Sequence, residues 1–117
     1  MTETVKYYPQ ESLVLQEDVP GAVMCAVALD QTMLTYFEVQ PECCFESHSH
    51  ESEQITFVFE GELLFEAEGE TVGVKAGEAI AIPANLPHAV FTHAEAVKAV
   101  DAWSPMMKKY KDVRRTK

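Results

Sequence analysis

The sequence predicts an all-β fold, an antiparallel sandwich or barrel, from two observations. Short runs in which apolar and polar residues alternate with a period of two recur along the chain, and Gly, Pro, Asn and Asp separate them. No helical period persists before residue 104. Short strands with such regular punctuation are typical of all-β sandwiches and barrels.

Each run between two turn signals is expected to be one strand. Gly61 separates two of the runs and favours a hairpin between them. Residues 105–115 could form one short helix, because Pro105 suits the first turn of a helix. The expected strands, eight or so in number, span residues 23–29, 33–39, 54–60, 62–67, 71–75, 78–82, 88–92 and 96–103.

Length and composition indicate an ordinary globular protein. The chain has 117 residues, of which 47% are hydrophobic and 24% are charged. A chain of this length is expected to form one domain, residues 1–117, because it is too short for a second independent core. We expect the barrel to span about residues 21–104 and a basic tail to span residues 105–117.

The charge argues against nucleic acid or an anionic membrane as partner. The net charge is −10, and both of these partners need a positive surface. Six of the nine basic residues but only one of the 19 acidic residues lie in 108–117, which gives that segment +5 and the preceding residues −15. We interpret the tail as a frayed or docking segment rather than a nucleic-acid arm, because the acidic body would repel phosphates.

Nothing in the sequence predicts a membrane span, a secretory signal or a disulfide framework. The longest apolar run, residues 22–29, has eight residues, against about 20 for a span. The first residues lack an apolar signal region. Cys25, Cys43 and Cys44 are odd in number and two are adjacent, so we expect a protein of the reducing cytoplasm. We interpret Cys43 and Cys44 as structural, because adjacent side chains alternate faces and at most one of them could reach the histidines.

The strand expected at 54–60 has one face for the interior and one for a partner. Exposure of both faces to solvent would be unfavourable, because each face carries apolar side chains. If Gln54 looks into the barrel, the opposite row looks out, and a homodimer would bury that row. The inward row is Gln54, Thr56 and Val58, and the outward row is Ile55, Phe57 and Phe59.

Three of the four histidines, His48, His50 and His88, form a candidate metal site. Residues i and i+2 of an extended strand face the same way, so His48 and His50 can present two imidazoles to one point. Gln54 has the same parity, and His88 opens another strand that antiparallel packing could bring opposite the pair. Three imidazoles and an amide oxygen suit a divalent transition metal. The alternative is an ordinary surface histidine pair.

The spacing resembles the two motifs of the cupin superfamily. The chain reads H-x-H-x3-Q-x6-G from His48 to Gly61, and G-x5-P-x-N-x2-H-x3-T from Gly77 to Thr92. This resemblance covers about residues 40–105 and implies a jelly-roll barrel with a metal near its centre. It implies one divalent ion per chain (nickel, zinc, manganese or iron), with the ligands His48, His50, Gln54 and His88.

Four positions depart from the superfamily pattern. Glu42 stands where the first motif has its leading Gly, and Thr92 replaces a terminal Asn. Asn85 replaces a turn Gly, which is tolerable because Asn accepts positive φ. Gln54 replaces the usual Glu ligand, so the site gains no negative charge from it.

A narrower resemblance concerns the segment Asp-Ala-Trp-Ser-Pro that begins at Asp101. Small cupins that linearise 4,5-unsaturated monouronates have a similar D-x-F-S-P-x-R pattern and also use three His and one Gln. The resemblance implies an acid/base role for Asp101 and a sugar-stacking wall at Trp103. A capping Asp and a core Trp are the alternative. Thr56, on the face of Gln54, is a second candidate for substrate binding.

One position of that pattern is not matched. Met107 stands where the resembling enzymes have Arg, and Met cannot bind a carboxylate. Lys108 or Arg114 could substitute for the missing Arg.

The sequence therefore favours a metal-dependent enzyme that acts on a small polar, carbohydrate-like or carbonyl substrate. Its sharpest version is ring opening of unsaturated monouronates. The alternatives are a metal-dependent dioxygenase, a non-enzymatic metal or small-ligand binding or sensor module, and a structural barrel whose site is vestigial.

Overall fold

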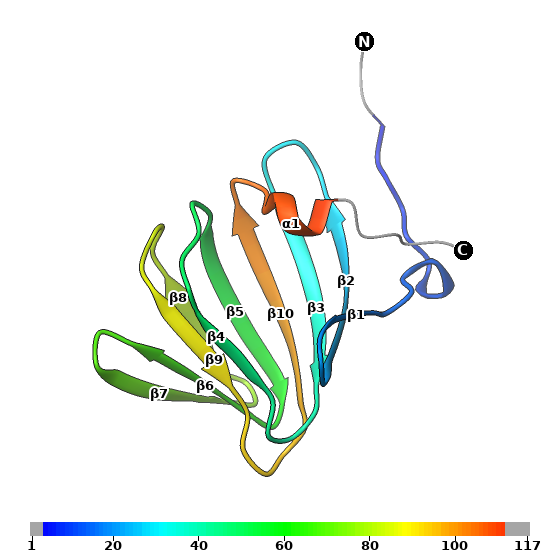
Figure 1. Cartoon of the computed structure of the whole chain (residues 1–117). Coiled ribbons are helices and arrows are strands. Elements are labelled where there is room, and N and C mark those ends of the chain that lie inside the picture. The colour runs from blue at the N-terminus through cyan, green and yellow to red at the C-terminus, as the bar shows by residue number, and fades with distance from the viewer. Residues whose placement is uncertain (1–3, 112–117) are drawn as a thin grey trace.

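The chain folds into two antiparallel β-sheets, seen in a computed structural model that describes residues 4–111 (Figure 1). The six-stranded sheet has the order β1-β2-β3-β10-β5-β8 and the four-stranded sheet the order β4-β9-β6-β7. The strands are β1 (Gln16–Val19), β2 (Ala22–Ala28), β3 (Met33–Val39), β4 (Cys44–His48), β5 (Glu53–Glu60), β6 (Glu62–Ala67), β7 (Glu70–Lys75), β8 (Ala79–Ile82), β9 (His88–Phe91) and β10 (Val97–Ser104).

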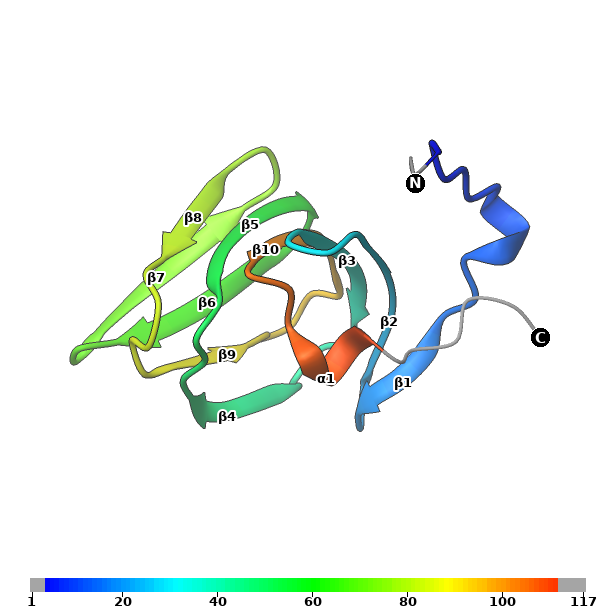
Figure 2. The same ribbon diagram turned by 90° about the horizontal axis from the view of Figure 1, so that it is seen from above.

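The two sheets face each other around a shared interior, as the view from above shows (Figure 2). The architecture is the expected all-β antiparallel jelly-roll barrel. Two short helical elements lie outside the sheets, η1 (Gln10–Ser12), a 3-10 turn, and α1 (Lys108–Lys111). Helix α1 lies over one open end of the barrel in Figure 2.

Two strands have no counterpart among those expected from the sequence. β1 and β4 are short, and neither carries a clear alternation between turn residues. β4 ends at His48, so His50 lies beyond the strand instead of two positions along it. The pairing of β4 with β9 also shifts register between Phe45 and His48. The other strands match their expected ranges to within one residue at each end.

The alternation in β5 separates inside from outside as the sequence predicts. Gln54, Thr56 and Val58 are buried, whereas Ile55, Phe57 and Phe59 are exposed. β10 follows the same rule, with Asp101 and Trp103 among its buried residues. Beside these polar residues the interior is apolar, and its most buried members include Val58, Val97 and Ala99, with Ala22, Met24 and Ala26 of β2.

Two of the motif departures fall at backbone positions that favour glycine. Glu42 and Asn85 have φ values of 58° and 65°. Both residues therefore keep the left-handed conformation that glycine adopts most easily. Gly61, between β5 and β6, is required more strictly, because its φ is 79° and a Cβ there would collide with the carbonyl oxygen of Ala96.

The C-terminal helix is shorter than expected and begins later. Residues 105–115 are expected to be helical, but α1 spans Lys108–Lys111 and residues 112–117 lie outside the described part of the chain. The hydroxyl of Ser52 donates a hydrogen bond to the carbonyl oxygen of Pro105 at 2.5 Å. Met106 and Met107 then pack against the core, ahead of the start of α1. No helix within residues 4–111 has the length and apolar character needed to cross a membrane.

Candidate metal centre

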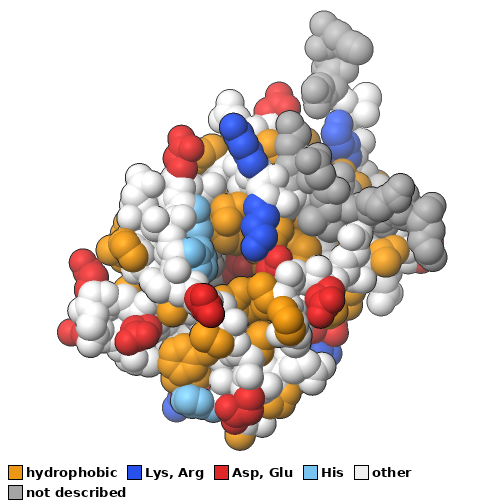
Figure 3. Space-filling model, viewed as in Figure 1, with side chains coloured by type: hydrophobic (Ala, Val, Ile, Leu, Met, Phe, Trp, Pro, Cys, Tyr) orange, Lys and Arg blue, Asp and Glu red, His pale blue; other side chains and the backbone are white. Residues whose placement is uncertain are grey.

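Three histidines converge at one end of the barrel. His48 is the last residue of β4 and His88 the first of β9, and the antiparallel register places them directly opposite each other. His50 follows β4 by two residues and joins them, with its ring centroid 5.4 Å from that of His48 and 4.9 Å from that of His88. One ligand nitrogen from each of the three lies within 4.8 Å of the others. Histidine is visible in Figure 3 beside a hollow in this face.

Backbone carbonyls hold each imidazole in one tautomer. Nδ1 of His48 lies 2.8 Å from the carbonyl oxygen of Glu46, and Nδ1 of His88 lies 2.8 Å from that of Leu86. Nδ1 of His50 lies 2.9 Å from the carbonyl oxygen of Ser52. A carbonyl can only accept, so Nδ1 carries the proton and donates, and Nε2 keeps its lone pair free for a metal.

A main-chain contact also holds the loop that carries His50. The backbone N–H of Asn85 donates to the carbonyl oxygen of His50 at 2.8 Å. Asn85 belongs to the turn before β9, three residues ahead of His88. This contact joins the two histidine-bearing segments, and it explains how His50 reaches the centre without belonging to a strand.

Gln54 enters the site from the opposite sheet. Its side chain is buried, and its Nε2 donates to Oγ1 of Thr56 at 2.9 Å. That bond fixes the orientation of the amide, so Oε1 is turned away from Thr56. Oε1 is one of three buried side-chain atoms without a hydrogen-bond partner among the described residues, together with Nε2 of His50 and Nε2 of His88.

These three unpaired atoms are all acceptors when the histidines have the tautomer described above. Buried acceptors without a donor are costly, and a bound cation satisfies them at once. The residues therefore fit a metal, and the donor set of neutral nitrogens and one amide oxygen suits a divalent transition ion. Burial lowers the pKa of His88, which keeps that ring neutral and able to bind a metal.

A buried carboxyl group lies in the same cavity. Asp101 accepts hydrogen bonds from Oγ1 of Thr56 at 2.5 Å and from Oγ1 of Thr35 at 3.2 Å. Burial raises the pKa of Asp101 to about 6, although these hydroxyl donors oppose the shift. Thr35 and Thr56 are the register partners of Asp101 on β3 and β5. The three side chains thus come from neighbouring strands of the six-stranded sheet.

Trp103 is tied to the same group of side chains. Its Nε1–H donates to Oγ1 of Thr35 at 2.9 Å, and its ring lies edge-on to His50 with 5.1 Å between centroids. Trp103 is 5% exposed, so its ring packs as a wall of the cavity. Both hydrogen bonds of Thr35 are thus used inside the site, one to Asp101 and one to Trp103.

Helix α1 covers the cavity through Tyr110. The Tyr110 ring lies 5.9 Å from the rings of Trp103 and Phe37, and its hydroxyl donates to Oδ2 of Asp18 at 3.2 Å. Lys109 binds the same carboxylate, with 3.3 Å between Nζ and Oδ1. The cavity beneath has about 50 Å³ of free space and is lined by His48, Gln54, His88, Asp101, Trp103 and Tyr110, with seven further residues, all apolar.

The structure brings together most of the residues expected at the site. His48, His50, His88, Gln54, Asp101, Trp103 and Thr56 lie in one region, whereas Cys43 and Cys44 do not join the histidine cluster. Thr35 and Tyr110 also belong to the site, although neither is among the residues expected from the sequence. Thr35 was visible as the polar member of an otherwise apolar inward row in β3, but Tyr110 carried no local signal.

The residues near the unmatched Arg position have separate roles. Met107 packs against the core, and Lys109 is engaged with Asp18. Lys108 is exposed at the start of α1, and Arg114 lies outside the described residues.

The fold and the histidine cluster can be compared with those of known proteins. A family model described as a cupin domain matches residues 35–103, more than half of the chain. The chain is similar to the solved structure of KdgF from Halomonas sp., with a TM-score of 0.80 and 23% identity, covering 89% of this chain and 98% of that one. No curated protein sequence matches the chain.

Two further solved structures are similar. An RmlC-like cupin from Shewanella frigidimarina gives a TM-score of 0.83 at 17% identity, covering 94% of this chain and 99% of the other. The polyketide cyclase RemF from Streptomyces resistomycificus gives a TM-score of 0.73 at 26% identity, covering 87% and 80%.

Proposed function

The chain belongs to the cupin family, and on this premise we propose that it is a metal-dependent enzyme acting on a small, oxygen-rich substrate. The observation that carries the proposal is the set of three unpaired acceptor atoms, because two of them, Oε1 of Gln54 and Nε2 of His88, belong to residues that line one cavity with Asp101. In a purely structural site, buried acceptors have hydrogen-bond donors and a carboxyl group is seldom buried beside them, so this arrangement indicates a functional site.

Four side chains would hold the metal. His48, His50 and His88 supply Nε2 atoms, and Gln54 supplies its amide oxygen. When bound, a divalent transition ion supplies Lewis acidity to a substrate carbonyl or hydroxyl. Because all four ligands are neutral, the ion keeps its full charge, although an amide holds it less tightly than a carboxylate would.

Asp101 is the proposed acid/base group. Its raised pKa of about 6 places both protonation states within reach near neutral pH, as proton transfer requires. The hydroxyls of Thr35 and Thr56 fix the position of the carboxyl group. Trp103 forms the adjacent wall, and Thr56 connects Asp101 to Gln54.

Ring opening of 4,5-unsaturated monouronates is the sharpest form of this proposal. It is supported by the resemblance of the Asp101–Pro105 segment to the cupins that linearise these sugars, together with the Gln among the ligands. In this reaction Asp101 would shuttle the proton that accompanies opening of the ring. Met107 in the place of Arg removes one charge-assisted contact, worth about 10-fold to 150-fold in binding or rate.

Substrate entry would require a movement of α1. The free space of about 50 Å³ is far smaller than a typical ligand pocket of about 300–1,000 Å³. Tyr110 and the Lys109–Asp18 ion pair close the cavity from above, so their displacement would admit a sugar-sized molecule. Opening would return the exposed Lys109 side chain fully to water and uncover the buried carboxylate of Asp18.

The test is loss of the ultraviolet absorbance of an unsaturated monouronate in the presence of metal-loaded protein. We expect a rate above that of the spontaneous reaction, and a much lower rate for Asp101→Asn with the same metal content. A rate equal to the spontaneous one, with metal confirmed in the site, would reject ring opening. The other metal-dependent reactions, including oxygen-dependent ones, and a non-enzymatic binding role would then be the remaining functions.

A further inference from the structure

Thr56 is buried between two residues of the candidate metal centre. Its side chain is 0% exposed, and it lies on β5 two positions from Gln54 and directly opposite Asp101 of β10. Gln54 and Asp101 line the cavity, whereas Thr56 does not. The hydroxyl of Thr56 therefore lies behind these two groups and away from the surface that a substrate would reach.

The hydrogen bonds of Thr56 run in one direction. Its Oγ1 donates to Oδ1 of Asp101 at 2.5 Å and accepts from Nε2 of Gln54 at 2.9 Å. A hydroxyl carries one proton, and an ionised carboxyl group can only accept. Asp101 therefore takes the proton of Thr56, and a lone pair is all that Thr56 can offer to Gln54.

This direction decides which end of the Gln54 amide faces the histidines. An amide side chain has its donors on the nitrogen and its acceptor on the oxygen. Only the nitrogen can bond to the lone pair of Thr56, so Oε1 is left without a hydrogen-bond partner among the described residues. The Nε2 atoms of His50 and His88 are unpaired acceptors in the same way. Gln54 thus presents an oxygen to an ion because its nitrogen is held by Thr56.

A glutamate at position 54 would not suit this arrangement. Its carboxylate would place an acceptor against Oγ1 of Thr56, whose one proton is already donated to Asp101. Two buried acceptors in contact without a proton between them are costly. The pair of Thr56 and Asp101 therefore explains why an amide stands where the superfamily pattern has Glu.

We propose that Thr56 is a positioning residue whose hydroxyl, bonded to Asp101, holds Gln54 as an oxygen ligand for the metal and does not itself contact the substrate. The inference rests on the metal site of the proposed function and adds the residue that turns Gln54 towards the ion. Groups that orient metal ligands contribute about 10-fold to 100-fold to metal affinity.

The experiment measures the dissociation constant for Co²⁺ by titration of the metal-free full chain at about pH 8, without substrate. Thr56→Val removes the hydroxyl and keeps the shape, whereas Thr56→Ser keeps the hydroxyl. Thr35→Val is the matched buried control. Thr35 is also 0% exposed and also donates to Asp101, but its hydroxyl accepts from Trp103.

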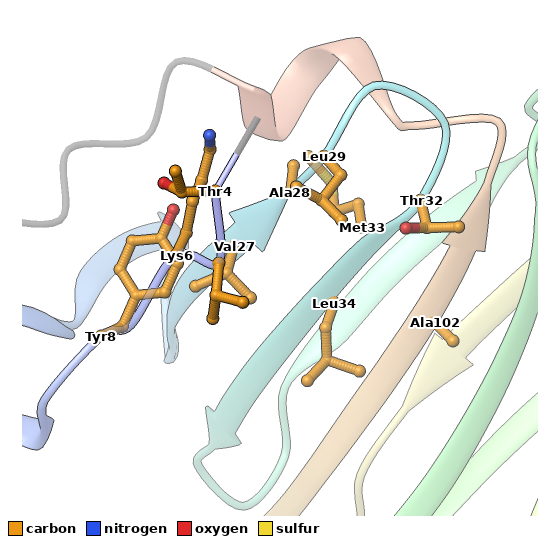
Figure 4. Close-up of a pocket in the computed structure, with 11 residues that line it drawn as sticks. Thr4, Lys6, Tyr8, Val27, Ala28, Leu29, Thr32, Met33, Leu34 and Ala102 are labelled. Atoms are coloured by element: carbon orange, nitrogen blue, oxygen red, sulfur yellow. The ribbon is translucent and has the colours of Figure 1, made fainter. Parts of the chain in front are cut away.

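A second control lies outside the centre. Thr32→Val makes the same change in a pocket of about 610 Å³ beside the N-terminal segment, residues 4–8, where Figure 4 shows Thr32. This pocket and the metal cavity have no lining residue in common. The control therefore measures the effect of the substitution itself.

We expect Thr56→Val to bind Co²⁺ about 10-fold to 100-fold more weakly than the wild type. Thr56→Ser, Thr35→Val and Thr32→Val should bind as the wild type does. Wild-type affinity in Thr56→Val would overturn the proposal. A loss of the same size in Thr35→Val would also overturn it, because general damage to the buried hydrogen bonds would then be the cause.

A double-mutant cycle shows whether Thr56 acts through Gln54. Thr56→Val combined with Gln54→Ala should bind Co²⁺ no more weakly than Gln54→Ala alone, because the amide that Thr56 orients is then absent. At saturation, the visible absorption of bound Co²⁺ should be the same in Thr56→Val and Gln54→Ala and differ from that of the wild type, since both lose the amide oxygen. Effects that multiply, or a wild-type spectrum in Thr56→Val, would overturn the proposal.

Gln54→Glu tests the same idea with Thr56 in place. It should bind Co²⁺ no more tightly than the wild type, although it adds a negative charge, and tighter binding would count against the role of Thr56. A wild type that binds no Co²⁺ would overturn the metal site and this inference together. Binding that is equal in the wild type and in Thr56→Val would overturn this inference alone.

Discussion

His48 and His88 face each other across the β4–β9 pair, with 4.5 Å between their ring centroids, although 39 residues separate them in the chain. The two strands belong to one sheet, whereas Gln54, Asp101 and Trp103 belong to the other. The candidate metal centre therefore joins the two halves of the barrel at one end. An ion bound there would cross-link the two sheets, because its ligands would come from both of them.

Metal content should depend on the three converging histidines and not on the fourth. We expect about one divalent transition ion per chain in the purified protein, and little in His50→Ala, which removes one of three nitrogen ligands. His93→Ala is the matched control, because His93 is exposed and outside the cluster. Elemental analysis of the three proteins checks this. Equal metal in the wild type and His50→Ala would contradict the assignment.

Metal affinity should fall as the solution becomes acidic. A histidine binds a metal only when it is neutral, so protons compete with the ion as the pH falls. Burial lowers the pKa of His88, so this ring loses the competition only in more acidic solution. More than one ring takes part, so the fall should become steeper than 10-fold per pH unit. Titration with a metal indicator between pH 8 and about 5 measures it. An affinity that is constant over this range would show that the histidines are not the ligands.

Asp101→Asn should abolish most of the turnover without disturbing the metal. A general acid or base contributes about 10²-fold to 10⁴-fold, so kcat should fall by that factor. KM and metal content should change little, since Asn keeps the size of the side chain and can still accept a hydrogen bond. Steady-state kinetics with elemental analysis would test this. A kcat within a factor of a few of the wild type would remove Asp101 from the mechanism.

The same substitution should stabilise the metal-free protein at neutral pH. Asp101 has a pKa of about 6 in the folded chain against about 3.9 when unfolded, so the folded state holds its proton more tightly. Its contribution to stability is therefore lost as pH rises from about 4 to 6, which costs about 3 kcal/mol above that window. Asp101→Asn should recover much of this at pH 7 but not at pH 4, as measured by urea unfolding. An equal change in unfolding free energy at both pH values would count against the shift.

Thr35→Val should destabilise the fold more than Thr35→Ser. Valine keeps the shape but leaves the buried N–H of Trp103 and one oxygen of Asp101 without a partner, at a cost of about 1–3 kcal/mol. Serine keeps the hydroxyl and loses one methyl group. Chemical denaturation of both variants separates these effects. A serine variant as unstable as the valine variant would mean that packing matters here more than hydrogen bonding.

Much of this arrangement follows from local sequence patterns. The period-two alternation of β5 and β10 places Gln54, Thr56, Asp101 and Trp103 on inward faces, because neighbouring side chains in a strand point to opposite sides. The position of His88 beside His48 and His50 is predicted by the resemblance of the two spaced motifs to those of the cupin superfamily.

Other features depend on contacts that no local pattern encodes. The sequence pattern predicts His48 and His50 on one extended strand. In the structure His50 lies beyond the end of β4, where the turn at Asn85 holds it by a main-chain hydrogen bond. Tyr110 reaches the cavity because Met106 and Met107 anchor the preceding segment on the core. Thr35 acquires its role only when β3 lies beside β10, since its two partners are on that strand.

The three carbonyl groups that orient the imidazoles belong to the main chain, and every amino acid at Glu46, Ser52 or Leu86 would supply the same oxygen. Substitutions at these positions can therefore change the side chain without changing which ring nitrogen faces the centre. A carboxylate in the same role would be lost through a single substitution. The geometry of the candidate metal centre is thus insensitive to the side chains at these three positions, and they can diverge while the orientation of the imidazoles stays the same.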